Sequence, residues 1–465
     1  MRMPKFAAMV VGMVLMSSAA EAALPSAVVL EHAVPLKGIS MPELRKMDRA
    51  RHAKTAVVNF SVGGGFVPFV KRLYYTSVRL GNPPKMYTFT IDTGNSIPWV
   101  ACNGCTGCSQ NLYNPDSSST SSRISCSDHR CKVAGQSGSG FCRTQSGLCG
   151  YDLKYGDQTR VSGYYVSDTM YFNTITGNQS SANSSASVVF GCINSQSNFL
   201  ETDGLLGFGQ DPLSIISQLN SQGVSPKSFS HCLKGSEDGG GTLVLGKIMA
   251  PGLVYTPLVP SQSLYTLNLE RIAVNGQKVP IDSSVFTTSD SQGTVVDSGT
   301  TLAYLVDGAH GPLVSAIIAA SSSSVRYMDA EWNGKGGGCF LSSNRIDLLY
   351  PTVTLYFKGG AAMTAKPSQY LVRQGTNGND TWWCIGWQSS DDLQGMQGIT
   401  ILGDIVLHDK LIVYDLGKGQ LGWTDYNCSS LNMMSKVDVS STSTYHSGGM
   451  IAIGVAAIWL GSLLL

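Results

Sequence analysis

The sequence predicts an all-β chain of two similar lobes with a few short helices. From Leu73 onward, β-branched and aromatic residues are separated by Gly, Pro and Asn residues, as in strands joined by turns. Long helical patterns are rare, and the best two cover residues 212–219 and 311–320, where Pro212 and Pro312 suit a first helical turn. A pair of short motifs also recurs in the same order in both halves of the chain, which indicates two related lobes.

The recurring motifs each combine an aspartate with a later glycine-containing stretch. Asp92 lies in "IDTG" and is followed by "GLLGFG" at 204–209. Asp297 lies in "VDSG" and is followed by "ILGD" at 401–404. A single Asp-Thr-Gly is usually an ordinary turn. Two unrelated turns, however, would not explain why the aspartate motif is followed by a glycine-containing stretch in both halves of the chain. Each lobe is therefore expected to donate one aspartate loop.

Composition places the chain among globular, strand-rich proteins and argues against nucleic acid as a partner. The 465 residues are enough for two or three domains of ~100–200 residues each. Charged residues make up 14% of the chain, below the typical ~25%, and the formal net charge is +1. Because no block of five or more basic residues occurs, a nucleic-acid-binding surface is not expected.

The two ends of the chain differ from the lobes. Residues 1–22 have the short positive start, apolar centre and small-residue end of a secretory signal peptide. Residues 23–71 are basic, partly helical in pattern and without cysteine, and we interpret them as a removable pro-segment. The N-terminal lobe is expected over residues 72–250 and the C-terminal lobe over residues 251–430. Residues 431–465 are interpreted as a linker and a glycolipid-anchor signal.

The C-terminal tail has the order of features found in glycolipid-anchor signals. Small residues beginning at Ser440 precede a polar spacer and the apolar stretch 450–465, which ends the chain. This stretch is short for a membrane-spanning helix, which needs ~20 residues, although a tail anchor or a weakly inserted helix is the alternative. The pattern predicts a protein of the secretory pathway that is held at the extracellular face of the plasma membrane or secreted.

Cysteine usage agrees with export to an oxidising compartment. The chain has 12 cysteines, and seven of them lie between Cys102 and Cys149. The stretch "CNGCTGC" has a zinc-like spacing, but the cysteines that follow are irregularly spaced, so disulfides are favoured and their pairing stays open. Sequons for N-glycosylation, which the same route makes usable, occur at Asn59, Asn178, Asn183, Asn379 and Asn427.

Several longer stretches resemble a known family. They include "YYTSVRLGNPPKMYTFTIDTG", "YDLKYGDQTRVSGYYVSDTM", "TDGLLGFGQDPLSIISQL", "VVDSGTTLAYL" and "ILGDIVLHDKLIVYDLGKGQLGWTDYNC". Over about residues 72–428 the chain resembles the pepsin family of aspartic proteases. The cysteine-dense stretch after the first aspartate is similar to that of the plant branch related to nepenthesin, which includes glycolipid-anchored members. The resemblance implies a bilobal pepsin-like fold with the active-site cleft between the lobes.

The resemblance also implies roles for individual residues. Asp92 and Asp297 match the two catalytic aspartates. Tyr155 matches the tyrosine of the flap, the hairpin that closes over substrate. The other positions that match the aspartate loops are Thr93, Gly94, Ser298, Gly299 and Thr300, of which Gly94, Gly299 and Thr300 are expected, like Tyr155, to lie against the substrate.

The same resemblance implies two disulfides and reveals two departures from the family pattern. The implied disulfides join Cys339 to Cys384 and Cys192 to Cys428. Asn95 stands where the family usually has Ser, and Gln158 stands where the flap usually has Gly. We expect the first departure to alter the proton affinity of the nearby aspartate, and the second to stiffen the flap or change specificity.

Two carboxyl groups about 3 Å apart can hydrolyse a peptide bond without a metal or cofactor. They do not readily ionise together, so they share one proton over an acid range of pH. The ionised carboxylate removes a proton from water, and the protonated carboxyl donates to the carbonyl oxygen of the peptide. The sequence therefore predicts an aspartic endopeptidase that acts as a monomer on peptide or protein substrates, bound to the membrane by its glycolipid anchor and without a cofactor.

Other functions are compatible with parts of the pattern. The first alternative is a catalytically weak, protease-like binding or inhibitor protein on the same fold, but such proteins lack a working aspartate pair. A glycosidase could use two carboxylates, yet the Asp-Thr/Ser-Gly repeat and the flap do not favour it. A metalloprotease is not expected because the sequence has no H-E-x-x-H motif, and His231 is interpreted as a packed structural residue.

The C-terminal pattern generates a direct prediction about membrane attachment. Treatment of intact cells with a phosphatidylinositol-specific phospholipase should release the protein into the medium, because that enzyme cuts the lipid from a glycolipid anchor. Release is measured by immunoblotting of medium and membranes. Retention on the membrane after treatment would instead support a tail anchor.

Overall fold

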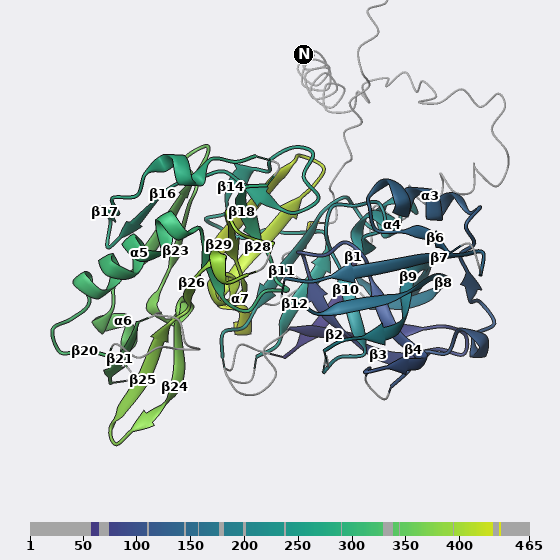
Figure 1. Cartoon of the computed structure of the whole chain (residues 1–465), viewed down its shortest axis with the longest axis horizontal. Helices are drawn as coiled ribbons and strands as arrows, with labels where there is room; N and C mark the ends of the chain where they lie inside the picture. Colours follow the sequence, from purple (N-terminus) through teal and green to yellow (C-terminus); the bar gives the residue numbers. More distant parts are fainter. Residues whose placement is uncertain are drawn as a thin grey trace, which may run out of the picture. The chain divides into compact units, whose positions relative to one another are not determined.

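The computed structural model describes residues 57–64, 74–108, 111–143, 146–156, 158–175, 181–198, 201–236, 239–289, 291–328, 338–343, 345–393, 395–430 and 437–438 (Figure 1). The predicted signal peptide, most of the predicted pro-segment and the predicted anchor signal lie outside the described residues. Within the described part of the chain, no helix is long and apolar enough to cross a membrane.

The N-terminal lobe consists mainly of strands. Its strands are β1 (Val57–Gly63), β2 (Tyr75–Leu80), β3 (Lys85–Asp92), β4 (Trp99–Thr106), β5 (Ser122–Arg123), β6 (Phe141–Arg143), β7 (Leu148–Lys154), β8 (Arg160–Ile175), β9 (Ser181–Gln196), β10 (Gly204–Gly207), β11 (Phe229–Leu233), β12 (Gly241–Leu245) and β13 (Lys247–Ile248). Its helical segments are the 3-10 turn η1 (Pro115–Ser117), α3 (His129–Gln136) and α4 (Ile215–Ser221).

The C-terminal lobe is built in the same way. Its strands are β14 (Val254–Pro257), β15 (Thr266–Leu267), β16 (Leu269–Val274), β17 (Gln277–Lys278), β18 (Gly293–Val296), β19 (Ala303–Leu305), β20 (Arg326–Met328), β21 (Cys339–Ser342), β22 (Val353–Phe357), β23 (Ala362–Ala365), β24 (Leu371–Asn377), β25 (Asp380–Ile385), β26 (Trp387–Ser389), β27 (Ile399–Leu402), β28 (Lys410–Asp415), β29 (Gln420–Asp425) and β30 (Val437–Asp438). Its helical segments are η2 (Ser283–Phe286), α5 (Asp307–Ala320), α6 (Ile346–Leu349), η3 (Pro367–Gln369), η4 (Ser390–Asp392), α7 (Asp404–Leu407) and η5 (Cys428–Ser430).

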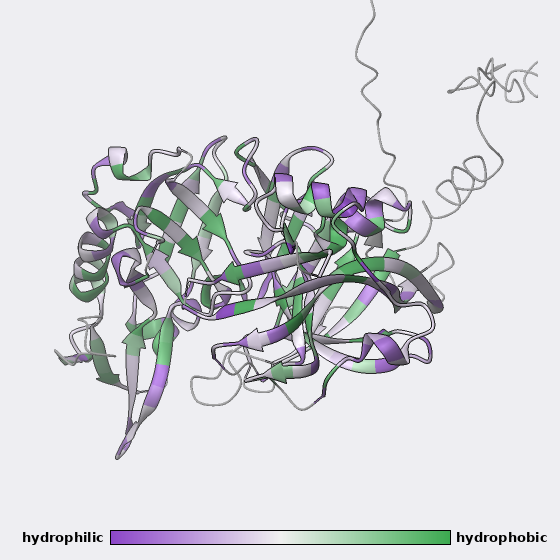
Figure 2. Ribbon diagram, turned by 45° about the vertical axis from the view of Figure 1, so that its right-hand side comes forward, coloured by the Kyte–Doolittle hydropathy of each residue, from purple (hydrophilic) through white to green (hydrophobic). Residues whose placement is uncertain are grey.

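One 15-stranded sheet joins the two lobes. Its order runs β14-β29-β28-β11-β12-β1-β2-β3-β10-β4-β9-β8-β7-β6, with β5 on β8. The lobes meet where β28 of the second lobe pairs antiparallel with β11 of the first. Hydrophobic residues are concentrated along the strands (Figure 2), and one buried cluster contains residues of both lobes. The predicted bilobal all-β fold is therefore confirmed.

The two predicted helices exist, but the prediction for their prolines is wrong. Helix α4 begins at Ile215, where the Ser214 hydroxyl caps it by accepting from a backbone N–H, so Pro212 precedes the helix. Helix α5 begins at Asp307, so Pro312 lies inside it rather than in its first turn. A proline in that position removes one intrahelical hydrogen bond, while neighbouring Leu313 and Ile317 are buried in the core.

Strand β1 lies within the stretch predicted as a pro-segment, yet it is a buried part of the sheet. It pairs antiparallel with β12 along residues 58–62 and also contacts β2 and β8. Val58 and Phe60 face the core with 0% and 4% of their surface exposed. A cut at residue 71 would therefore remove a core strand unless β1 stays bound to the sheet.

All 12 cysteines form disulfides, which supports the disulfide interpretation of "CNGCTGC" over zinc. The predicted bond between Cys339 and Cys384 is confirmed. The predicted bond between Cys192 and Cys428 is wrong, because parallel pairing of β4 with β9 brings Cys192 beside Cys102 instead. The remaining bonds are Cys105–Cys108, Cys126–Cys142, Cys131–Cys149 and Cys232–Cys428.

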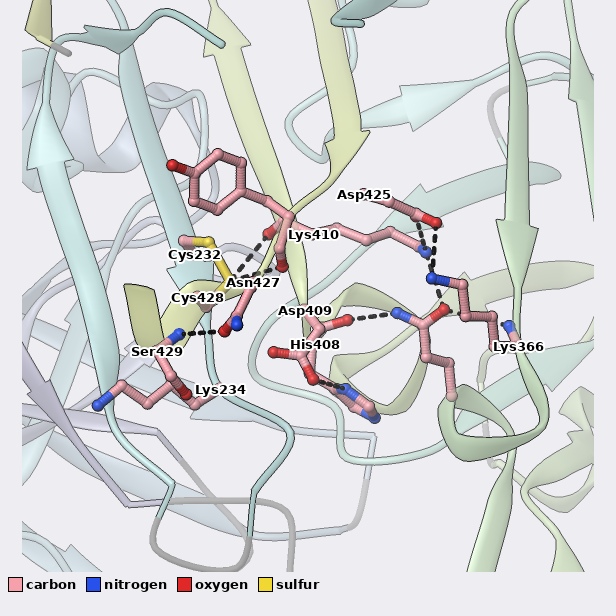
Figure 3. Close-up of polar contacts among 12 residues, drawn as sticks. Cys232, Lys234, Lys366, His408, Asp409, Lys410, Asp425, Asn427, Cys428 and Ser429 are labelled. Atoms are coloured by element: carbon pink, nitrogen blue, oxygen red, sulfur yellow. Dashed lines mark hydrogen bonds and ion pairs between the residues drawn. A yellow bond between two sulfur atoms is a disulfide. The ribbon is translucent and has the colours of Figure 1, made fainter. Parts of the chain in front are cut away.

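A buried lysine fixes the hairpin of β28 and β29 close to the Cys232–Cys428 bond (Figure 3). The Lys410 ammonium, with 0% exposure, donates to the Thr364 carbonyl at 2.7 Å and to Gln369 Oε1 at 2.9 Å. It also donates to Asp425 Oδ1 at 2.8 Å, and Lys366 lies 3.2 Å from the other carboxylate oxygen. Burial lowers the pKa of Lys410, while the Asp425 carboxylate acts in the opposite direction.

The burial of β1 predicts that this strand remains in the mature protein. Phe60→Ala should lower the free energy of unfolding by about 3–5 kcal/mol, because it removes a buried ring from the core. The solvent-facing Ser61→Thr on the same strand, which keeps the Asn59 sequon, is the matched control and should change stability by less than about 0.5 kcal/mol. Urea unfolding of the mature proteins provides the measurement. Equal stability of Phe60→Ala and wild type would show that β1 is dispensable.

Candidate active site

The two aspartates lie at the ends of equivalent strands. Asp92 ends β3, which pairs in parallel with β10, and Asp297 follows β18, which pairs in parallel with β27. The Phe208 N–H donates to the Asp92 carbonyl at 2.8 Å, and the Asp297 N–H donates to the Leu402 carbonyl at 3.0 Å. This geometry explains the recurring motifs, because the later glycine-containing stretch in each half is the strand that holds the aspartate loop.

Reciprocal hydrogen bonds tie the two aspartate loops together. The Ser298 N–H donates to Thr93 Oγ1 at 2.9 Å, and the Thr93 N–H donates to Ser298 Oγ at 3.3 Å. Each hydroxyl then donates to a backbone carbonyl on the opposite side, Thr93 to Val296 at 3.2 Å and Ser298 to Ile91 at 3.3 Å. Because Thr93 and Ser298 are fully buried, these bonds are shielded from water.

Two glycines let the carboxyl groups approach each other. A methyl group on Gly94 would overlap the carboxyl group of Asp297, and one on Gly299 would overlap that of Asp92. Each glycine also donates its N–H to the aspartate of its own loop at 2.8 Å. Glycine is therefore required at both positions by space, and its backbone supplies a hydrogen bond to each carboxylate.

The two aspartates form one interacting pair. Burial raises the pKa of Asp92 well above its usual value, and the charge of Asp297 and a hydrogen bond between the two side chains raise it further. Backbone N–H groups of Gly94 and Asn95 oppose this rise. On the other aspartate, the Thr300 hydroxyl donates to Asp297 Oδ2 at 2.5 Å. The arrangement favours one shared proton on the pair.

Tyr155 lies beside the first aspartate loop, as expected for a flap residue. It directly follows β7 and begins the turn to β8, where its N–H donates to the Thr159 carbonyl at 2.8 Å. Its hydroxyl oxygen accepts from Trp99 Nε1 at 2.7 Å and from Asn95 Nδ2 at 2.8 Å. Gln158, where the family usually has Gly, takes a left-handed conformation with φ of 70°, so the hairpin keeps the glycine-like backbone with a strained residue.

A buried aromatic cluster supports the tied loops from behind. Tyr414 stacks on Phe229 with ring centroids 4.1 Å apart, and Tyr265 meets Tyr414 edge-on at 4.6 Å. The fully buried His231 ring lies 3.2 Å from the Tyr414 hydroxyl, and burial lowers the pKa of His231 to about 3. His231 is thus a neutral packed residue, and its predicted structural role is confirmed.

Asp404 belongs to the site, although sequence reasoning did not assign it a role. It is fully buried at the start of α7, and its N–H donates to the Thr300 carbonyl at 2.8 Å. Within the described residues, neither of its carboxyl oxygens has a hydrogen-bond partner. Burial raises the pKa of Asp404 well above its usual value, and the charges of Asp297 and Asp92 act in the same direction. Its position in "ILGD", one residue after the glycine that contacts the loop, was the available signal.

The structure also places the predicted glycosylation sites that it describes. Asn183, Asn379 and Asn427 are not buried and lie on β9, on the turn between β24 and β25, and directly before η5. Asn178 lies outside the described residues. Asn59 is on the outer face of β1 and is partly exposed. Attachment of sugar at these positions stays a prediction.

Comparison with known proteins places both halves of the chain in one group. The model of the xylanase inhibitor N-terminal domain matches residues 74–247, and that of the xylanase inhibitor C-terminal domain matches residues 264–425. Aspartic proteinase 36 of Arabidopsis thaliana is 34% identical over 432 residues, covering 90% of this chain and 86% of the relative. Aspartic proteinase nepenthesin-1 of Nepenthes gracilis is 28% identical and covers 77% of this chain and 78% of the relative.

Solved structures of seed proteins share the fold. Conglutin gamma from lupine seeds superimposes with a TM-score of 0.63 at 20% identity, covering 80% of this chain and 95% of that protein. Basic 7S globulin from soybean gives a TM-score of 0.62 at 19% identity, covering 83% and 99%.

The raised pKa values predict that stability falls as pH rises. Asp92 and Asp404 bind protons more tightly in the folded than in the unfolded chain. Their contribution to folding is complete below the usual carboxyl pKa of about 4 and is lost as pH rises through the raised values. Asp404→Asn is neutral at every pH, so it should match wild type at about pH 4 and lose less stability by about pH 8.

Urea unfolding at a series of pH values measures this difference. Asp282→Asn is the matched control, because Asp282 is an exposed carboxylate whose pKa is lowered by hydrogen bonds from Ser284. This control should follow wild type as pH rises above about 5. An equally steep loss of stability in Asp404→Asn and wild type would contradict a protonated Asp404.

Proposed function

We propose that this chain, which belongs to the plant aspartic protease family built from xylanase inhibitor N-terminal and C-terminal domains, is an aspartic-type endopeptidase. The observation that carries the proposal is the hydrogen-bonded pair of Asp92 and Asp297, held by buried reciprocal bonds between their loops. The names of relatives such as aspartic proteinases 36 and 39 of Arabidopsis thaliana support peptide or protein substrates.

The geometry accounts for both proton transfers of hydrolysis. With one proton on the pair, the ionised carboxylate takes a proton from a water molecule, whose oxygen attacks the peptide carbonyl carbon. The protonated carboxyl gives its proton to the carbonyl oxygen, so a neutral tetrahedral intermediate forms and the pair again holds one proton. In the collapse of this intermediate the C–N bond breaks, the protonated carboxyl gives its proton to the leaving nitrogen, and the other carboxylate takes the proton of one hydroxyl. The pair then again holds one proton.

The surrounding loops keep the pair ready for this chemistry. The N–H groups of Gly94 and Gly299 favour an ionised carboxylate, whereas burial and mutual repulsion favour a protonated one. Because these two influences on the carboxyl groups oppose each other, they suit a pair that holds a single proton. Tyr155, Gly94, Gly299 and Thr300 are proposed to contact the extended peptide, with Tyr155 held beside the first loop by Trp99 and Asn95.

A second candidate is a binding or inhibitor protein on the same fold, which the names of both matching domain models favour. An inhibitor has no need of a buried, repelling carboxyl pair, whose desolvation is costly. Retention of Asp92 and Asp297 with both glycines therefore favours hydrolysis.

The cellular setting of the enzyme is part of the proposal. The predicted signal peptide, the twelve cysteines in disulfides and the sequons support passage through the secretory route. The C-terminal pattern supports attachment to the extracellular face of the plasma membrane by a glycolipid, or secretion. A pro-segment ending before β1 and a monomeric enzyme complete the proposal.

Removal of either catalytic carboxyl tests the proposed function. Asp92→Asn and Asp297→Asn should each reduce kcat/KM by at least about 10²-fold, since proton transfer by positioned groups contributes ~10²–10⁴-fold. Cleavage of a peptide library at several acid pH values, with and without pepstatin, is the measurement, and Asp282→Asn is the control. Undiminished cleavage by both variants would exclude the mechanism. An uncleaved library together with inhibition of a glycosidase would support the second candidate.

A further inference from the structure

We infer that Asn95 is a positioning residue that fixes the flap tyrosine Tyr155 and sets the direction of its hydroxyl proton. This inference rests on the proposed endopeptidase function and names a determinant of substrate binding in the same site. It starts from the contacts of one side chain in the first aspartate loop, at a position where the family usually has the shorter serine.

The Asn95 side chain has a defined orientation. Its Oδ1 accepts from the Ile97 N–H at 3.0 Å, forming a turn within the loop. The carboxamide nitrogen Nδ2 donates to the Tyr155 hydroxyl at 2.8 Å and more weakly to the Ile97 carbonyl at 3.5 Å. Because only the nitrogen can donate, the bond to Ile97 fixes which end of the carboxamide reaches the tyrosine.

The backbone of Asn95 is held equally firmly. Its carbonyl accepts from the Gly209 N–H at 2.9 Å, and its N–H helps to keep the pKa of Asp92 from rising further. One residue thus contacts the catalytic carboxylate through its backbone and the flap tyrosine through its side chain. Asn95 therefore joins the flap tyrosine to the loop that carries Asp92.

The two donors also determine what the tyrosine hydroxyl can do. Its oxygen accepts from Trp99 Nε1 and Asn95 Nδ2, which uses both of its lone pairs. Any further hydrogen bond of this oxygen is one in which Tyr155 donates.

A serine at position 95 would separate the two contacts. Its hydroxyl can still accept from the Ile97 N–H, so the turn is preserved. Its side chain is too short to reach the Tyr155 hydroxyl as well. Asn95→Ser therefore removes the bond to the flap while leaving the loop intact.

The expected effect of Asn95→Ser is on KM rather than kcat. The Asn95 bond holds Tyr155 in place before a peptide binds, so its loss makes bound peptide and transition state pay equally for ordering the flap. A typical hydrogen bond corresponds to about 3- to 10-fold in binding, and KM should rise by this factor with kcat changed less than about 2-fold. The matched control is Asn114→Ser, since Asn114 makes the same kind of turn, to the Asp116 N–H, at the start of η1. This control should leave KM unchanged.

A double-mutant cycle with Tyr155→Phe separates the flap bond from other effects. Because phenylalanine has no hydroxyl, Asn95→Ser should have no further effect on KM in the Tyr155→Phe background. Equal effects of Asn95→Ser in both backgrounds would overturn the inference, as would an unchanged KM in the single variant.

Two further readouts keep this test distinct from a failure of the proposed function. Pepstatin affinity, measured by calorimetry, should fall in Asn95→Ser by the same factor as KM rises. Amide hydrogen exchange of the flap hairpin at 154–160 should be faster in Asn95→Ser than in wild type, whether or not the protein turns over peptides. If the wild-type protein neither cleaves peptides nor binds pepstatin, the proposed function is contradicted. If hydrogen exchange in Asn95→Ser is the same as in wild type, only the inference about Asn95 is contradicted.

Discussion

The reciprocal hydrogen bonds between Thr93 and Ser298 are the interaction on which the rest of the site depends. They are made between buried groups of two loops that come from different lobes, so each bond lost would leave a buried donor or acceptor unpaired. By fixing the loops, they hold two carboxyl groups closer than their charges alone would allow. The pair at Asp92 and Asp297 is thus an arrangement that favours one shared proton and that the fold holds together.

Several other parts of the molecule hold the two aspartate loops in position. Strand β10 pairs in parallel with β3 and strand β27 with β18, so each holds one aspartate loop. The aromatic cluster around Tyr414 packs behind the loops. The shared sheet joins the lobes through β11 and β28, while the Cys232–Cys428 bond and buried Lys410 fix the end of the second lobe nearby. Burial raises the pKa of Asp92 and Asp404, so the free energy of unfolding is expected to be higher at acid pH than at neutral pH.

The sequence allowed prediction of the features that a short motif determines. It did not allow prediction of the features that depend on how strands far apart in the sequence pair with each other. The two Asp-Thr/Ser-Gly motifs, each with its later glycine-containing stretch, predicted two lobes, and the resemblance to the pepsin family implied the pairing of Asp92 with Asp297. The partner of Cys192 was missed because the close cysteines permit many pairings, and only the alignment of β4 with β9 selects Cys102. The contact of Asn95 with Tyr155 was missed because residues far apart in sequence meet only through the flap hairpin.

The pH dependence of kcat/KM for a peptide substrate tests most directly whether the two aspartates act as one pair with a single proton. The account predicts a bell-shaped profile confined to the acid range, because activity requires one proton on the pair and is lost when the pair gains a second or loses the first. A profile with a single limb that rises to a plateau at neutral pH would contradict the shared proton and with it the role given to the tied loops.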